Sequence, residues 1–323
     1  MPRKSSGPEA GGKYRSILVP LDGSRLSEQA LPLAVAIAER ARAKLRLVLV
    51  YQYPVVPLSA KGRQLYVALE LAARKSEKAY LKTFTEQLKK QSSSLAISST
   101  ALMGPVARTL NEYIHESRTD LVVMTSRGQG GLRRLWLGSV ADAMIRRSSV
   151  PVLLVRPEEN PSPRPVLENL RQILVPVDGS ALAETILDPA KELASLAGAE
   201  LMLVEVIQPL ASPLESQSAA PLRFDVELTD LRRKEAADYL RDLAEECLKA
   251  GVKAAYSAPL GTNVADTILG LAESPMVGMI ALATHGRGGV KRLALGSVAD
   301  KVVRAAPRPV LVYRPPKRSR SRS

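Results

Sequence analysis

Short apolar runs alternate with longer amphipathic stretches along the whole chain. In the amphipathic stretches apolar residues recur at helical spacing, which predicts helices near 24–43, 65–88, 106–116 and 139–147. The apolar runs between them predict strands at 16–20, 45–51, 95–103, 120–124 and 150–156. The same order of strands returns near 172–176, 200–207, 252–258, 277–283 and 309–313. Strand–helix alternation of this kind predicts βαβ units and a mostly parallel sheet with helices on both faces.

The second half of the chain repeats the first. ILVPLDGS at 17–24 and ILVPVDGS at 173–180 agree at seven of eight positions, and 128–157 agrees with 286–315 at 17 of 30. Because the matches keep their order, they indicate a duplicated domain. We therefore expect two tandem open five-stranded α/β domains. The expected units are a disordered tail at 1–14, domains at 15–157 and 171–315, a Pro-rich linker at 158–170 and a basic disordered tail at 316–323.

Composition adds limits to this picture. Of the 323 residues, 46% are hydrophobic but only 4% are aromatic, so Val, Leu, Ile and Ala must build the cores. The single cysteine, Cys247, excludes an intrachain disulfide and is expected in a helix core. No apolar run is long enough to span a membrane, and the polar N-terminus does not look like a secretory signal. We expect a soluble, cytoplasmic protein.

The first loop with candidate chemistry follows the first strand of each half. It contains Pro20, Leu21 and Asp22 in one half and Pro176, Val177 and Asp178 in the other, each followed by Gly-Ser. Ligands of parallel sheets bind beyond the carboxyl ends of strands, so this position favours a binding role. A tight Asp-Gly turn that caps the next helix explains the same residues equally well.

The second loop follows the fourth strand and is rich in glycine. In the first half it carries Arg127, Gly128, Gly130 and Gly131 before a Gly138-Ser139-Val140 helix start. The second half has the same spacing, with its residues at His285, Gly286, Arg287, Gly288, Gly289, Gly296, Ser297 and Val298. A Gly-Ser helix start exposes backbone N–H groups that favour a phosphate. The competing interpretation is a Ser-x-x-Asp capping box, which needs no ligand.

Together these motifs resemble the universal stress protein family, whose nucleotide loop reads G-x2-G-x9-G-[ST]. The resemblance covers nearly the whole chain outside the tails, the linker and the segments after the second strands. It implies an adenine-nucleotide α-hydrolase-like, Rossmann-like fold that binds ATP, or ADP or AMP, with Mg2+ as a candidate accompanying ion. The aspartates, Asp22 and Asp178, and the strand-two residues, Val50 and Val206, would hold the adenine. The glycine loops would hold ribose and phosphates.

The chain departs from the family pattern at the first glycine of the loop. Thr125 stands there in the first half and Ala283 in the second. Thr is β-branched and is expected to crowd the ribose or to resist the required dihedral, whereas Ala is small. The histidine common in this loop is present as His285 but replaced by Arg127 in the first half. The second half is therefore the preferred nucleotide site. His285 has no partner at metal spacing, and no metal site is expected.

Several functions stay open. The leading hypothesis is an ATP-binding, regulatory stress-response protein with slow or no hydrolysis, because no general base or nucleophile is evident near the loops. The alternatives are a nucleotide-free scaffold for protein interactions and a weak ATPase or ATP-using transferase. A nucleic-acid binder that works through the basic tails is a further alternative, given the net charge of +14. The resemblance also implies that the two fifth strands pair as an intramolecular pseudo-dimer, and it leaves a homodimer of chains open.

Overall fold

The computed structural model describes residues 14–52, 60–127, 137–157, 167–209, 226–284 and 295–315. The expected tails, most of the linker and the two glycine-rich segments 128–136 and 285–294 lie outside these ranges. One residue of the expected N-terminal tail, Tyr14, is described, and it is buried with 3% of its surface exposed. Leu167, at the end of the expected linker, is buried as well.

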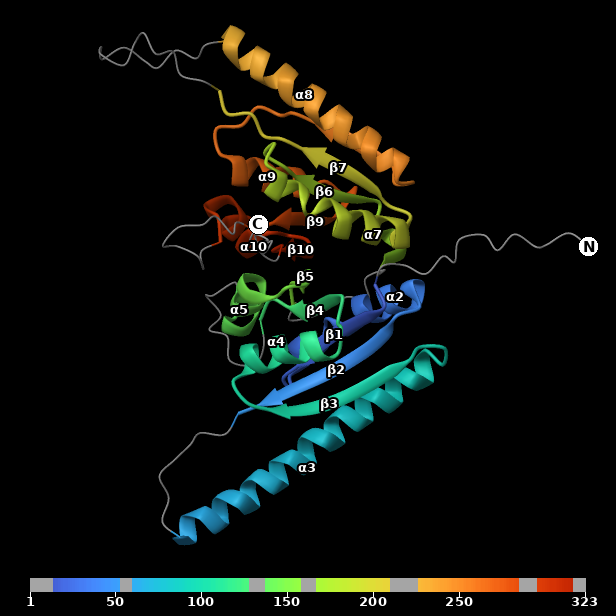
Figure 1. The fold of residues 1–323 in the computed structure, drawn as a ribbon, viewed down its shortest axis with the longest axis vertical. Coiled ribbons are helices and arrows are strands. Elements are labelled where there is room, and N and C mark those ends of the chain that lie inside the picture. The colour runs from blue at the N-terminus through green and yellow to red at the C-terminus, as the bar shows by residue number, and fades with distance from the viewer. Residues whose placement is uncertain are drawn as a thin grey trace, which may run out of the picture.

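The first half alternates strands and helices in the predicted order (Figure 1). Its elements are β1 (Ser16–Leu21), α1 (Arg25–Glu28), α2 (Leu31–Ala41), β2 (Lys44–Tyr51), α3 (Ala60–Gln91), β3 (Ile97–Met103), α4 (Val106–Glu116), β4 (Leu121–Thr125), α5 (Ser139–Arg147) and β5 (Val152–Val155).

The second half repeats this order after a short 3-10 turn, η1 (Leu167–Asn169). Its elements are β6 (Gln172–Pro176), α6 (Ala181–Glu184), α7 (Leu187–Ala197), β7 (Glu200–Val204), α8 (Val226–Lys249), β8 (Ala254–Ser257), α9 (Val264–Ala272), β9 (Val277–Ala283), α10 (Ser297–Ala305) and β10 (Val310–Tyr313).

All ten strands form one sheet, in the order β3-β2-β1-β4-β5-β10-β9-β6-β7-β8. Within each half the neighbouring strands are parallel, which confirms the predicted fold class. The strand order reverses between β1 and β4 in the first half and between β6 and β9 in the second. Such switch points open a crevice at the carboxyl ends of the strands. The Asp-Gly-Ser loops and the glycine-rich loops both start there.

The two halves meet along one antiparallel pair of strands. Val310, Leu311 and Val312 of β10 pair with Leu154, Leu153 and Val152 of β5. We call this pair the seam. It confirms that the fifth strands pair, and it covers two apolar edges that would otherwise be exposed.

Helices cover both faces of the sheet, and each face has its own apolar core. One core contains buried residues of α2, α3, α7 and α8, and the other those of α4, α5, α9 and α10. Cys247 lies in the first of these cores with 1% of its surface exposed, as predicted, and its thiol is free. No helix among the described residues is long and apolar enough to span a lipid bilayer.

The helix predicted over 24–43 is wrong in one respect, because two helices occupy this stretch. α1 ends at Glu28 and α2 starts at Leu31, with Pro32 in its first turn. Pro32 has no N–H to donate to Glu28, and its ring would clash with that carbonyl group in a continuous helix. Pro189 lies one position later in the first turn of α7, and the second half shows the same break after α6.

Side chains also join the halves on both faces of the sheet. The hydroxyl of Tyr14 donates to the Pro189 carbonyl oxygen at 3.2 Å. On the other face ion pairs join α5 and α10, which face each other across the seam (Figure 1). Arg146 approaches Asp300 at 3.9 Å and Arg304 approaches Asp142 at 3.8 Å, while each arginine also pairs with the aspartate of its own helix at 2.8 Å. The same ion pairs thus cross the seam in both directions.

Candidate functional site

The Asp-Gly-Ser loop forms a hydrogen-bonded turn in both halves. Asp22 Oδ1 accepts from the backbone N of Ser24 at 3.0 Å and from its hydroxyl at 2.6 Å. Asp178 Oδ1 accepts from Ser180 in the same way, at 3.1 and 2.5 Å. Each serine hydroxyl then caps the following helix. The capping interpretation of this loop is confirmed, and both aspartates are exposed at the switch point.

The neighbours of these aspartates are held by the strands. Pro20 and Leu21 belong to β1, and Pro176 ends β6 with Val177 directly after it. Leu21 and Val177 are buried, whereas Pro20 and Pro176 are half-buried. The loop is therefore anchored through its apolar residues, and the carboxylates remain in contact with solvent.

The N-termini of α5 and α10, which follow the glycine loops, do not form the predicted capping boxes, so that interpretation is wrong. Gly138 and Gly296 are the N-cap residues, and neither helix has a side-chain cap hydrogen bond. Ser139 and Ser297 are the first helical residues and are exposed. Asp142 and Asp300 instead pair with the arginine of their own helix at 2.8 Å and approach the arginine across the seam at 3.8 and 3.9 Å. Both helices therefore begin with backbone N–H groups that no capping side chain satisfies, which is the arrangement that favours an anion.

Thr125 does not hinder the loop through its backbone. Among the described residues only Arg42 and Arg118 combine a side chain with positive φ, so the missing first glycine is not a left-handed position in either half. The Thr125 hydroxyl donates to the Arg127 carbonyl oxygen at 2.7 Å. Gly138 N donates to the Ser126 carbonyl oxygen at 2.7 Å, which brings the two ends of the loop together. In this structure Thr125 thus has an ordinary backbone conformation, and its effect on the ribose stays a prediction.

The second half offers an unsatisfied hydroxyl at Thr284, the position of Ser126 in the first half. Ala283 ends β9 and is half-buried, and Thr284 follows with 2% of its surface exposed. Thr284 Oγ1 has no hydrogen-bond partner among the residues that the structure describes. Strand alternation places Thr284 on the face of Leu282, which is packed in the core beside α10. A buried hydroxyl without a partner is costly, and a ligand or water at the start of α10 would relieve that cost.

The strand-two residues lie at the same edge. Val50 belongs to β2, whereas Val206 follows β7, which ends at Val204 and not at 207 as predicted. Both side chains are half-buried. A Cβ atom on Gly261 would come within 3.1 Å of Val206 Cγ1 and 2.1 Å of Thr267 Oγ1. A Cβ atom on Gly104 would likewise lie 2.5 Å from Thr109 Oγ1. Sequence reasoning missed these glycines, although the repeat of Gly104 and Gly261 after the third strands was a signal.

The long helices contribute a tyrosine to each half that was also missed. Tyr80 of α3 donates to Glu28 at 2.9 Å, and Tyr239 of α8 donates to Glu184 at 2.9 Å. Burial and the bonded glutamate raise the pKa of both tyrosines. The charge of Asp22 adds to the effect on Tyr80, and that of Asp178 to the effect on Tyr239, so each pair lies near an Asp-Gly-Ser loop.

One carboxyl group belongs to the second half alone. Glu205 follows β7, and its register equivalent in β2 is Leu49. Burial raises the pKa of Glu205, the charge of Arg232 lowers it, and the nearby charge of Asp178 raises it. The second site is therefore more acidic on its Asp178 side. No group of three or more His, Cys, Asp or Glu residues that could hold a metal occurs in the described ranges.

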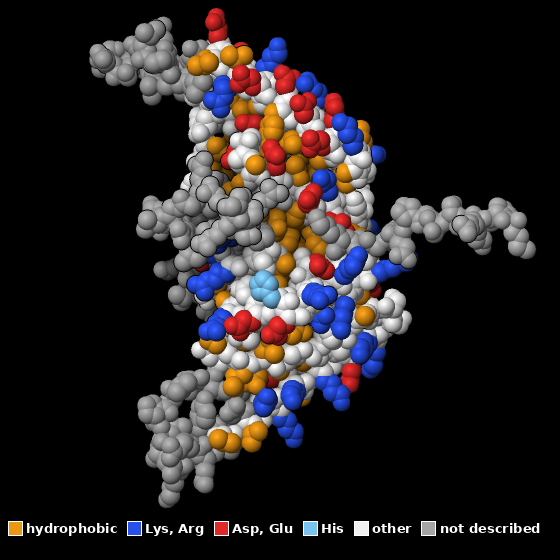
Figure 2. All heavy atoms as spheres, in the orientation of Figure 1, with side chains coloured by type: hydrophobic (Ala, Val, Ile, Leu, Met, Phe, Trp, Pro, Cys, Tyr) orange, Lys and Arg blue, Asp and Glu red, His pale blue; other side chains and the backbone are white. Residues whose placement is uncertain are grey.

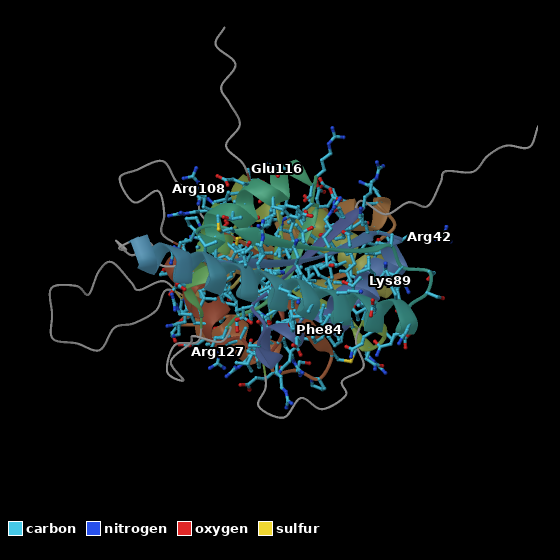
Figure 3. The ribbon with its side chains drawn as sticks, turned by 90° about the horizontal axis from the view of Figure 1, so that it is seen from below. Arg42, Phe84, Lys89, Arg108, Glu116 and Arg127 are labelled. Atoms are coloured by element: carbon cyan, nitrogen blue, oxygen red, sulfur yellow. The ribbon has the colours of Figure 1, made fainter. Side chains whose placement is uncertain are left out.

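Several predicted site residues cannot be placed, because they lie outside the described residues. They are Gly128, Gly130, Gly131, His285, Gly286, Gly288, Gly289 and Arg287. Arg127 is described and half-buried, and Figure 3 shows it at the border of the described chain. Val140 and Val298, in the first turns of α5 and α10, are half-buried and pack against the core of that face.

The fold and these loops define a tandem α/β protein with two candidate phosphate-binding crevices, and known proteins share this plan. The profile of the universal stress protein family matches residues 13–156 and 169–314. The chain belongs to the universal stress protein family.

Individual relatives agree with this assignment. A universal stress protein of Mycobacterium tuberculosis is 27% identical over 93% of this chain and 95% of its own length. One from Methanocaldococcus jannaschii is 32% identical over 44% of this chain and 82% of its own length. Among solved structures, a universal stress protein from Archaeoglobus fulgidus has a TM-score of 0.68 at 21% identity, covering 94% of this chain and 99% of that one. This last similarity supports the fold alone.

Proposed function

We propose that this chain binds adenine nucleotide, ATP in the first place, and acts as a regulatory stress-response protein with slow or no hydrolysis. The observation that carries the proposal is the pair of Gly-Ser helix starts without side-chain caps. Both follow the fourth strand of a half, and both have an Asp-Gly-Ser turn across the switch point. Helix N-termini of this kind stabilise phosphate through their N–H groups and their dipole.

One group of residues would bind the phosphates of the nucleotide, and another would bind its adenine. The backbone N–H groups of Ser297 and Val298 would hold phosphate oxygens, as would those of Ser139 and Val140 in the first half. Asp178 has one carboxylate oxygen in the turn, so its second oxygen is suited to accept from the adenine amino group. Val206 and Gly261 would line the base. The acidic Asp178 side and the helix start thus suit opposite ends of one nucleotide.

The second half is the preferred site. Thr284 Oγ1 is a buried hydroxyl without a partner among the described residues, whereas Ser126, at the same position in the first half, has no such unpaired buried hydroxyl. A ligand in the second half would therefore remove a penalty that the first half does not have. Mg2+, if it accompanies the nucleotide, would be held by the phosphates and by water, as is usual for this ion.

The test is the number of nucleotides bound per chain. The purified protein is denatured and its supernatant examined for adenine nucleotides, and binding of added ATP is measured by calorimetry. Gly296→Val places a branched side chain at the α10 start, and Gly138→Val is the matched change at α5. We expect Gly296→Val to abolish most binding and Gly138→Val to have the smaller effect. If the wild-type protein carries no nucleotide and ATP changes neither heat nor melting temperature, the chain is a nucleotide-free scaffold.

Asp178→Asn tests the adenine end of the site separately from the phosphate end. Asn keeps an acceptor oxygen for the Ser180 turn but removes the charge. We expect weaker binding of ATP with little change in melting temperature, and Asp22→Asn serves as the control in the other half. Phosphate or AMP release followed on the same samples tests the enzyme alternative. Steady turnover lost in Gly296→Val would show that the protein is an ATPase or an ATP-using transferase.

The cellular location belongs to the same proposal. The one thiol, Cys247, is buried and free, which suits a reducing compartment such as the cytoplasm.

A further inference from the structure

The long helices of the two halves differ strongly in charge. α3 contains eight basic and three acidic residues, whereas α8, its counterpart, contains five basic and seven acidic residues. Figure 2 shows the result on one face of the molecule. Lys and Arg side chains predominate along α3, while both signs are mixed over α8.

The basic residues of α3 are exposed along its described surface. They are Arg74, Lys75, Lys78, Lys82, Lys89 and Lys90. From the first to the last of them the helix rises roughly 24 Å. Only Lys82 among them forms an ion pair in the described part of the chain, with Glu86 at 3.8 Å. The charge of this helix is therefore largely available to a partner.

The basic surface continues onto the amino ends of the neighbouring strands. Arg15, Arg42, Lys44 and Arg118 are all exposed there. Backbone hydrogen bonds hold these ends together: Leu45 N donates to Ala96 O at 2.9 Å, and Lys44 N donates to Arg15 O at 2.8 Å. The Asp120 carboxylate accepts from the backbone N of Arg15 at 2.8 Å. Within the described ranges none of these four basic side chains forms an ion pair. Figure 3 shows Arg42 and Lys89 toward the same end of the molecule.

Two of these arginines occupy unfavourable backbone positions. Arg42 has φ 52° and Arg118 has φ 50°, in the left-handed region that favours glycine. The residue at the Arg42 position of the second half is Gly198, with φ 67°. Lys44 is likewise matched by Glu200 and Arg118 by Met276. At these three positions the first half has a basic side chain where the second half has glycine, an acid or an apolar residue, whereas Arg15 is matched by the exposed Arg171. Backbone strain like that of Arg42 and Arg118 is typical of functional surfaces.

We propose that this basic face, formed by α3 from Arg74 to Lys90 and by Arg15, Arg42, Lys44 and Arg118, binds the phosphate backbone of duplex nucleic acid. Its length matches about seven base pairs of a duplex, and phosphates repeat along that length at a spacing that lysines can follow. Sequence-independent contact of this type needs no base readout.

Other polyanions fit the face less well. Large exposed apolar residues would anchor a helix in a lipid surface, but among the described side chains of α3 these are Val67 and Leu71, which both precede Arg74. Single strands are bound by stacking on exposed aromatic rings. The aromatic residues within this stretch, Tyr80 and Phe84, are half-buried, and Tyr80 is bonded to Glu28.

The experiment measures binding of a fluorescent mixed-sequence duplex of about 20 base pairs to the full chain over a series of salt concentrations. The test variant combines Lys75→Gln, Lys78→Gln and Lys89→Gln. The matched control combines Lys234→Gln, Lys249→Gln and Lys253→Gln, three exposed lysines of the second half that give the same net charge. Melting temperatures establish that both variants are folded.

We expect the test variant to bind more weakly by a factor on the order of 100 at 0.1 M salt, and its salt slope to fall by about three. The control should lose only a fewfold in affinity. Equal losses in both variants would overturn the proposal, because net charge alone would then explain binding.

Two further results would also overturn it. One is wild-type affinity in the test variant together with loss of binding when 316–323 are deleted, which would assign binding to the C-terminal tail. The other is binding to vesicles of phosphatidylserine, weakened in the test variant, with no binding to the duplex.

Discussion

The first half of this protein carries its excess charge on a helix and at the amino ends of strands, whereas the second half carries acidic groups on α8 and beside its candidate site. The cores do not show this difference. Leu153 and Leu311 meet in the seam with no exposed surface on either side, and Tyr80 and Tyr239 make the same hydrogen bond. The duplicated chain thus keeps one set of internal contacts in both halves. Its surfaces have diverged, which is the expected result when packing constrains the interior and function differs outside.

The seam gives the largest expected effect. Leu153→Ala and Leu311→Ala each remove a buried side chain, and each should lower the free energy of unfolding by about 2–5 kcal/mol. Urea unfolding measures this, with Leu260→Ala, at an exposed position, as a control that should change little. A large cost in only one of the two seam variants would contradict an equal contribution from the halves.

The tyrosine–glutamate pairs come next. Tyr80→Phe and Tyr239→Phe each lose one hydrogen bond to a carboxylate, and each should cost about 1–2 kcal/mol of stability. Different costs in the two halves would show that the equal geometry hides unequal energetics.

The same tyrosines predict a loss of stability in alkali. Their pKa is raised above the ordinary value of 10.0 in the folded protein. Above about pH 10 the unfolded chain therefore loses these protons first, and stability falls as the pH rises. Melting curves between about pH 8 and 11 should fall less steeply in the double Phe variant.

A smaller effect is expected from exchanging the residues at the C-terminal caps of α2 and α7, Arg42 and Gly198. Arg42→Gly relieves a left-handed non-glycine residue and should raise the free energy of unfolding by about 0.5–1 kcal/mol. Gly198→Arg should lower it by a similar amount. The Arg42→Gly protein should also bind duplex more weakly. If both stability and duplex affinity increased, nucleic-acid binding would not explain why a strained arginine is present at this position.

The smallest effect is expected at Glu205. Because burial raises its pKa above the ordinary 4.5, its ionised form is disfavoured in the folded state, and stability falls as the pH rises from acid toward neutral. Glu205→Leu should therefore raise the melting temperature more at pH 7 than near pH 4. Glu205→Gln should do so less, since it brings no apolar side chain. An equal gain at both pH values would show packing alone.

Most of the fold could be predicted from the sequence, because the hydrophobic periodicity and the internal duplication each extend over many residues. The strands, the parallel order within each half and the paired fifth strands are confirmed. The missed details depend on single backbone contacts. Pro32 and Pro189 break a helix that their apolar spacing continues, and β7 ends at Val204, with a single further bridge at Ile207.

The candidate site was less predictable for a similar reason. The loops after the first and fourth strands were identified from their glycines, but the Ser-x-x-Asp pattern predicted a capping box that the structure lacks. Asp142 and Asp300 instead pair at 2.8 Å with the arginine four residues later in their own helix, and they approach the arginine of the other half at 3.8 and 3.9 Å. The Ser-x-x-Asp pattern by itself contains no information about these competing partners. Tyr80 and Tyr239 were missed because their glutamates lie more than fifty residues away.

The seam has one consequence for how such a protein can respond to its surroundings. Two separate subunits that pair through their fifth strands obey mass action, and dilution separates them. Here both strands belong to one chain, so the paired state does not depend on protein concentration. A signal from either crevice must therefore act by changing the shape or stability of a permanent pair, and not by changing how many pairs exist.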